Sequence, residues 1–158
     1  KEPDLSFVNR VDSMDSDADV VVVFGGTNDF GHGDAKLGTF ESRDPYTFYG
    51  AMHVLCEKLI NRFPNADILF MTPLHRCSED EVSKENGLPE ETNLAGYVSI
   101  IREVAEFYGL PVLDLFSTSG LQPKVDIIKE TYMPDGLHPS DAGALRIALR
   151  LMGFLQTL

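Results

Sequence analysis

The stretch Asp19-Val-Val-Val-Val-Phe-Gly-Gly-Thr-Asn-Asp29 contains the pattern that decides the fold. Four valines and a phenylalanine follow one another without polar alternation, which is typical of a central strand buried on both faces of a parallel sheet. The run ends at Gly25-Gly26, where the backbone can turn tightly and approach a ligand closely. Because ligands of open α/β sheets bind beyond the carboxyl ends of the strands, Asn28 is a candidate site residue. The alternative is that these polar residues only cap a helix or form a turn.

Length and composition indicate a single acidic domain. The chain has 158 residues, 43% of them hydrophobic, as expected for one globular domain spanning residues 1–158. Its formal net charge of −12 disfavours nucleic acid and anionic membrane surfaces as partners, and no apolar run is long enough for a membrane span. The start, Lys1-Glu2-Pro3-Asp4, has neither an initiator methionine nor the apolar segment of a signal peptide. The compartment, cytoplasmic or secreted, therefore stays open.

Further apolar runs extend the parallel sheet. Residues 68–71 and 111–115 predict strands, and helical spacing of apolar residues predicts helices within 45–63, 94–108 and 140–158. Strands that alternate with helices predict a three-layer α/β/α domain with a flavodoxin-like parallel sheet. On the last helix, five residues are expected to face the core: Leu145, Ala148, Leu149, Met152 and Leu155.

A short turn near the C-terminus carries an acid and a base. Asp135 and His138 are three residues apart, between Pro134 and Pro139. In such a turn the carboxylate can accept a hydrogen bond from Nδ1–H of the imidazole, which leaves Nε2 free to act as a general base. The alternative is a structural Asp–Pro turn that only happens to carry a histidine.

Together the two stretches resemble the SGNH (GDSL-like) ester hydrolase family. Gly26-Thr-Asn-Asp29 matches its Gly-x-Asn-Asp block, and Asp135-Gly-Leu-His-Pro139 matches its Asp-x-x-His-Pro block, in the same order. The resemblance implies that Asp135 and His138 are two members of a catalytic triad. It further implies that Asn28 donates its amide to the oxyanion of the tetrahedral intermediate, while Gly26 and Asp29 support the loop.

The same resemblance exposes a gap. The family's nucleophile is the serine of a Gly-Asp-Ser block near the N-terminus, and no such block precedes the first predicted strand. Ser117 and Ser119, after the third predicted strand, lack the flanking glycines of a nucleophile turn and are interpreted as structural. The resemblance therefore implies that the chain is N-terminally incomplete, lacks its first β-strand and helix, and is inactive without the serine block.

The predicted activity of the complete protein is that of a serine esterase acting on small carboxylic esters, such as acetyl or short acyl groups on sugars or lipids. No metal or organic cofactor is implied, because the triad generates its own nucleophile. The loops 30–40 and 74–91 are expected to shape the substrate pocket. Loss of an edge strand would leave the sheet open to pairing, so a homo-oligomer is among the expected states.

Two other classes of protein stay open. One is a non-catalytic remnant or binding module that lacks the nucleophile. The other is a metallophosphoesterase, which the Asn-containing loop resembles faintly, although the Asp-x-His start and the clustered histidines of that class are absent. His75 and Cys77 follow the second predicted strand but have no third ligand at metal-site spacing.

Overall fold

The computed structural model describes residues 6–32, 36–81 and 93–158. Among these, three parallel strands form one sheet in the order β1-β2-β3, with β1 at Val20–Phe24, β2 at Asp67–Met71 and β3 at Val112–Leu113. Phe24 pairs with Met71, and Met71 with Leu113, so the strands end together at one edge of the sheet. Ligand sites of parallel sheets form at this edge.

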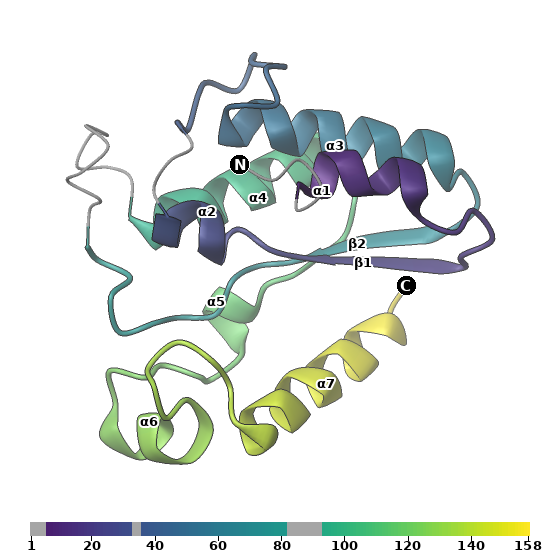
Figure 1. Cartoon of the computed structure of the whole chain (residues 1–158). Coiled ribbons are helices and arrows are strands. Elements are labelled where there is room, and N and C mark those ends of the chain that lie inside the picture. The colour runs from purple at the N-terminus through teal and green to yellow at the C-terminus, as the bar shows by residue number, and fades with distance from the viewer. Residues whose placement is uncertain (1–5, 33–35, 82–92) are drawn as a thin grey trace.

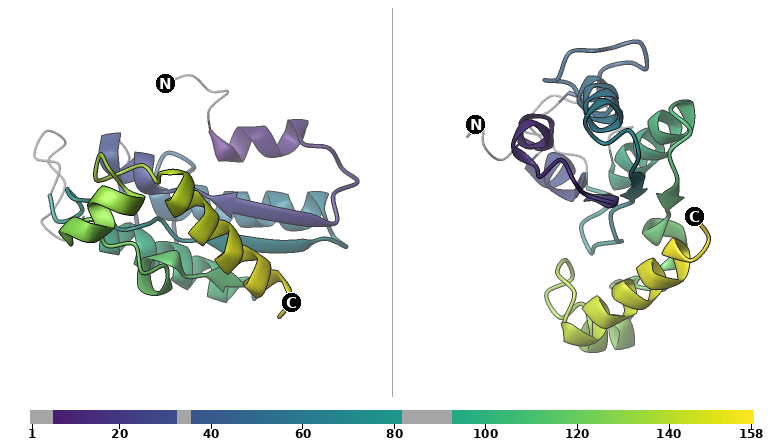
Figure 2. Two further views of the ribbon diagram at one scale, coloured as in Figure 1. Left: turned by 90° about the horizontal axis from the view of Figure 1, so that it is seen from below. Right: turned by 90° about the vertical axis from the view of Figure 1, so that its right-hand side faces the viewer.

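Helices cover the two faces of the sheet, which gives the three-layer α/β/α fold that the sequence predicted (Figure 1). One face carries α1 (Phe7–Arg10), the 3-10 helix η2 (Val11–Ser13), α3 (Phe48–Arg62) and α4 (Leu94–Phe107). The other carries α5 (Leu115–Thr118), α6 (Asp126–Tyr132) and α7 (Asp141–Leu155). The two turned views in Figure 2 show the same division, with α6 and α7 on the side of the sheet opposite to α3. The short helix α2 (Thr27–His32) follows β1 directly.

The middle strand β2 separates two apolar cores. Ile68 and Phe70 point into a core formed with α3 and α4, whereas Leu69 and Met71 point into a second core with α6 and α7. All four side chains are buried, because successive residues of a strand face opposite sides of the sheet. The predicted burial of a strand on both faces is thus confirmed for β2.

For β1 the same prediction is wrong. Val21 is buried against the α3–α4 side, but Val20, Val22 and Phe24 are 44%, 39% and 44% exposed on the other face. Within the described part of the chain, β1 is an edge strand rather than a central one. The physical reason is that α7 packs beneath β2 and β3 through the second core, so that nothing described covers this face of β1.

The predicted core face of α7 is also wrong for most of its residues. Leu145, Leu149 and Met152 are 61%, 58% and 59% exposed. Of the five predicted residues, Leu155 packs onto the second core, beside a neighbouring stripe of Ile147, Leu151 and Phe154. The helix carries two apolar stripes, and apolarity alone did not distinguish the one that the described fold buries.

Side-chain caps define where the long helices begin. Thr47, Asn93 and Ser140 accept hydrogen bonds from the amides of Gly50, Gly96 and Gly143 at 3.2, 3.1 and 3.3 Å. Strand β3 is shorter than predicted, because Asp114 caps α5 by accepting the Ser117 N–H at 3.2 Å.

No helix in the described ranges is long and apolar enough to cross a membrane. The expected substrate loops are described only in part: residues 33–35 and 82–91 lie outside the described ranges.

Candidate active site

The turn from β1 into α2 places Asn28 at the carboxyl edge of the sheet. Gly26 has a φ of 101°, and a Cβ at this position would lie 3.1 Å from Ile101 Cδ1 and 3.3 Å from Pro73 Cγ. Glycine therefore fits both the left-handed conformation and the close packing. Phe30 is buried and packs edge-on against Tyr97, with ring centroids 5.9 Å apart, which anchors α2 to α4. Asn28 is exposed on the outer side of this anchored turn.

Asp135 and His138 form the predicted acid–base pair. Asp135 Oδ2 lies 2.7 Å from His138 Nδ1. Asp135 Oδ1 accepts the backbone N–H groups of Leu137 and His138 at 2.8 and 2.7 Å. The hydrogen bond from the imidazole, followed by those two amides, holds the pKa of the Asp135 carboxyl well below its usual range. An ionised carboxylate at Nδ1 assigns the ring proton to that nitrogen and leaves Nε2 as the acceptor.

One cavity of about 170 Å³ brings the two motifs together. Asn28 from the start of α2 and His138 from the turn before α7 both line it. The structure also places Pro73 and Leu74 in its wall, directly beyond the carboxyl end of β2. The full lining is Phe24, Gly25, Thr27, Asn28, Pro73, Leu74, Leu137, His138 and Pro139. Leu74 belongs to the loop 74–91 that was expected to shape the substrate pocket. Pro73 and Leu137 were not expected here, although the position of Pro73 after a strand was a usable signal.

Three further residues considered from the sequence do not line this cavity: Asp29, Ser117 and Ser119. Asp29 is exposed on α2, and its expected role in supporting the loop remains a prediction. Ser117 Oγ accepts a hydrogen bond from Arg102 at 2.8 Å, and buried Ser119 accepts the Leu121 N–H at 3.2 Å. These bonds fit the structural interpretation of both serines.

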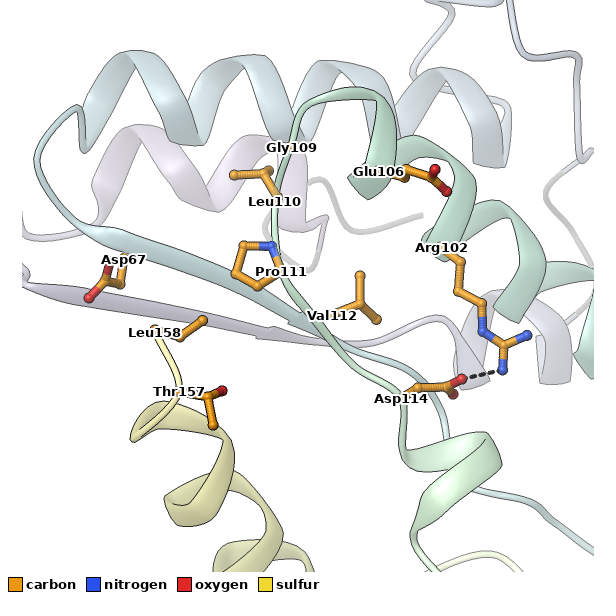
Figure 3. Close-up of a pocket in the computed structure, with 10 residues that line it drawn as sticks. All are labelled: Asp67, Arg102, Glu106, Gly109, Leu110, Pro111, Val112, Asp114, Thr157 and Leu158. Carbon is orange, nitrogen blue, oxygen red and sulfur yellow. Dashed lines mark hydrogen bonds and ion pairs between the residues drawn. The ribbon is translucent and has the colours of Figure 1, made fainter.

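A larger hollow of about 670 Å³ contains none of the motif residues (Figure 3). It lies between α4, β3 and the C-terminal residues, and the Arg102–Asp114 ion pair at 2.6 Å spans one side of it. Its lining is Asp67, Arg102, Glu106, Gly109, Leu110, Pro111, Val112, Asp114, Thr157 and Leu158. Burial raises the pKa of Asp114, but hydrogen bonds from Ser117 and Thr72 and the charge of Arg102 outweigh burial and lower it overall. The ion pair thus links α4, which carries Arg102, to Asp114, the residue that caps α5.

Metal-binding side chains do not gather in the part of the chain that the structure describes: no group of three or more His, Cys, Asp or Glu there is placed to hold an ion. His75 instead pairs with Glu79, with Nδ1 and Oε2 2.6 Å apart, and stacks on Phe116 with ring centroids 3.9 Å apart.

The comparisons agree with the fold. The model of the GDSL-like Lipase/Acylhydrolase family matches residues 4–146. The chain belongs to this family.

Solved structures show the same architecture. One is 38% identical with a TM-score of 0.87, and the match covers 100% of this chain and 74% of that one. A protein from Lactobacillus plantarum is 32% identical with a TM-score of 0.83, over 95% of this chain and 72% of that one. The acetyl xylan esterase AlAXEase, at 22% identity and a TM-score of 0.58, shares the fold over 94% of this chain and 75% of its own. Comparison with curated proteins gives no match.

Proposed function

We propose that this chain supplies the histidine, the aspartate and one oxyanion-hole donor of a serine esterase that acts on small carboxylic esters. The nucleophilic serine would come from polypeptide outside these 158 residues. Membership of the GDSL-like lipase/acylhydrolase family supports ester hydrolysis as the reaction class. The observation that carries the proposal is the single cavity lined by both Asn28 and His138.

In the proposed reaction, the serine Oγ attacks the ester carbonyl carbon while its proton passes to Nε2 of His138. The negative charge that develops on the carbonyl oxygen is stabilised by the Asn28 side-chain N–H, which donates without carrying charge itself. The imidazolium returns the proton to the leaving alkoxide as the C–O bond breaks. A water molecule that gives a proton to Nε2 of His138 then attacks the acyl carbon. The bond to the serine Oγ breaks, Oγ takes the proton back from His138, and the carboxylic acid is released. Asp135 holds the imidazole through Nδ1–H and stabilises its charged form.

The described wall of the cavity suits an apolar acyl group, because Phe24, Pro73 and Leu74 line it.

The free edge of β1 is the place where a serine-bearing strand would add. Among the described residues β1 pairs only with β2, and its exposed face carries Val20, Val22 and Phe24. Phe24 also lines the cavity, so a parallel strand paired along β1 would end beside His138. The similar structures at 38% and 32% identity are longer than this chain, which spans 74% and 72% of them.

The test is hydrolysis of p-nitrophenyl acetate by the protein extended with any residues encoded in frame ahead of Lys1, beside its His138→Ala variant. Turnover that falls by several orders of magnitude in His138→Ala supports the proposal. Equal rates for the two proteins would remove His138 from the mechanism. If no Gly-Asp-Ser is encoded upstream and the extended protein is inactive, the chain is instead a non-catalytic member of the family that serves as a binding module.

A further inference from the structure

Residues 74–81, named here the bridge segment, connect the two halves of the candidate site. The segment follows β2 and begins with Leu74, whose side chain is buried in the wall of the cavity. From there it contacts the turn that carries Asn28 on one side and the turn that carries His138 on the other. The segment itself is neither helix nor strand.

Arg76 makes the contact with the Asn28 side. Its Nη1 donates to the backbone carbonyl of Thr27, the residue before Asn28, at 3.4 Å. Its guanidinium also lies over the ring of Phe30, 5.3 Å from the centroid. A cation over an aromatic face adds attraction beyond the hydrogen bond. Arg76 thus touches α2 at residues on either side of Asn28.

Cys77 makes the contact with the His138 side. Its backbone N–H donates to the carbonyl of Gly136 at 2.9 Å. Gly136 has a φ of 78°, and a Cβ there would lie only 2.5 Å from Cys77 Sγ. The turn between Asp135 and His138 is therefore seated directly against the bridge segment.

Glu79 fixes the conformation of the segment. Its side chain is 8% exposed, and its two carboxylate oxygens have separate sets of partners. Oε2 lies 2.6 Å from His75 Nδ1 and accepts the Arg76 N–H at 3.2 Å. Oε1 accepts from Gln122 Nε2 at 3.1 Å and lies 2.8 Å from Lys124 Nζ.

The charge state of Glu79 fits this role. Burial raises the pKa of Glu79, but hydrogen bonds from Lys124, His75 and Gln122 outweigh burial and hold the pKa below its usual range. The carboxylate is thus ionised at neutral pH and accepts at both oxygens.

We propose that Glu79 is a positioning residue for the esterase: by holding the bridge segment, it sets the placement of Asn28 relative to His138. The inference rests on the proposed function for its catalytic consequence, whereas its structural part stands on the contacts of Arg76 and Cys77. Glu79 touches no reacting atom in this scheme. It acts through the two neighbours that reach the turns.

The structural part is tested by NMR on the 158-residue chain with Glu79→Gln. An amide nitrogen donates but does not accept, so one pair of donors around residue 79 loses its acceptor. We expect the Asn28 side-chain amide resonances and the Gly136 backbone resonance to shift, and the Cys77 amide to exchange faster with solvent. The matched control is Glu81→Gln, in the same segment but exposed, which should move neither turn. Changes confined to the immediate partners of Glu79 would overturn the proposal.

Arg76→Met provides a second variant if Glu79→Gln does not fold. It keeps an unbranched side chain over Phe30 but removes the donor to the Thr27 carbonyl. We expect shifts at Thr27 and Asn28 with Gly136 unchanged. Asn28 resonances at their wild-type positions would overturn the proposal.

The catalytic part is tested in the extended, serine-bearing protein with p-nitrophenyl acetate. Misplacement by about 1 Å can cost on the order of 10²-fold in rate, so we expect Glu79→Gln to lower kcat by roughly 10- to 100-fold. KM should change less than kcat, because no residue that lines the cavity is replaced, and Glu81→Gln should match wild type. Wild-type kcat in Glu79→Gln would overturn the positioning role. An inactive wild-type protein would instead overturn the proposed function, and the NMR comparison would then decide whether Glu79 holds the two turns.

Discussion

Asn28 and His138 line the same cavity, although one follows the first strand of the described sheet and the other precedes its last helix. The parallel register of β1 and β2 is one cause, because it brings the residues after β1 to the same edge of the sheet as the residues after β2. The other cause is the position of the turn at residues 134–139, which carries His138. This turn packs against the segment that follows β2, where the Cys77 N–H donates to the Gly136 carbonyl. An amide side chain and an imidazole thereby line one small, mostly apolar space.

The first prediction concerns the oxyanion. Asn28→Ala removes a donor that is needed only when negative charge develops on the carbonyl oxygen, so kcat should fall while KM changes little. Loss of one such donor typically costs about 10²–10³ in kcat. The measurement is steady-state hydrolysis of p-nitrophenyl acetate by the extended protein. Asn65→Ala, in the exposed turn after α3, is a matched control that should retain full activity. A wild-type kcat in Asn28→Ala would exclude Asn28 from the oxyanion hole.

The second prediction concerns the pair of Asp135 and His138. Asp135→Asn keeps an oxygen that can accept the two backbone amides, but it no longer provides a negative charge at Nδ1. Loss of the charge and of the enforced tautomer costs on the order of 10⁴-fold in kcat in the serine protease precedent, and we expect a loss approaching that size. Nitrogen-15 NMR of the imidazole should show the Nδ1–H tautomer in wild type. The same tautomer population in Asp135→Asn would contradict the assigned role.

Titration of Asp135 gives an independent check on the same pair. Because hydrogen bonds from His138 and from two amides lower its pKa, the carboxyl should titrate below the ordinary aspartate value of about 3.9. The resulting stability is present above that ordinary value and is lost as the pH falls through the lower, folded-state pKa. Carbon-13 NMR of the carboxyl measures this directly, and the His138→Ala variant should titrate closer to the ordinary value.

The local features of the site could be predicted from the sequence, whereas the features made by the surroundings could not. The pairing of Asp135 with His138 needs only a short turn, and the position of Asn28 needs only the end of a strand. The contact of Arg76 with Thr27 runs from a side chain to a backbone carbonyl, and that of Cys77 with Gly136 joins two backbone groups. Both contacts join segments that are far apart in the chain, and no pattern in the sequence indicates them.

The fold shows the same division. The unbroken apolar run of β2 correctly predicted burial on both faces. Residues of α4 share one apolar core with this strand, and residues of α7 share the other. The equally apolar run of β1 did not, and neither did the stripe of Leu145 and Leu149. Apolar patterning shows that burial of a surface is favourable, but it does not show whether the described part of the chain buries that surface.

The third prediction concerns stability at mildly acidic pH. His53 on α3 is fully buried among aromatic rings, and its Nδ1 lies 3.1 Å from Tyr108 Oη. Burial and the nearby charge of Arg43 lower the pKa of His53. They outweigh the opposing effects of a hydrogen bond with the Phe40 backbone and of the charges of Glu57 and Glu103. The unfolded chain therefore binds a proton below about pH 6.5 that the folded chain does not bind until the pH is lower. Stability should fall as the pH drops through this window.

Urea unfolding at pH 7.5 and at pH 5.5 measures this effect. The midpoint of wild type should decrease at the lower pH, and the His53→Leu variant should lose part of that decrease. His32→Gln is a control at an exposed histidine and should keep the full decrease. Identical pH dependence in wild type and His53→Leu would show that another group is responsible.

The fourth prediction concerns the open edge of β1. Val20, Val22 and Phe24 give an exposed apolar face beside an edge whose backbone groups have no partner strand in the described ranges. Such an edge favours pairing with another chain, so the 158-residue chain should self-associate as its concentration rises. Val22→Glu places a charge in the centre of this face and should shift the chain toward the monomer in sedimentation velocity. Ile127→Glu changes a residue on α6 that is 64% exposed and should leave the association unchanged. A wild-type chain that stays monomeric throughout, or an equal effect of the two substitutions, would show that the β1 face is not the contact.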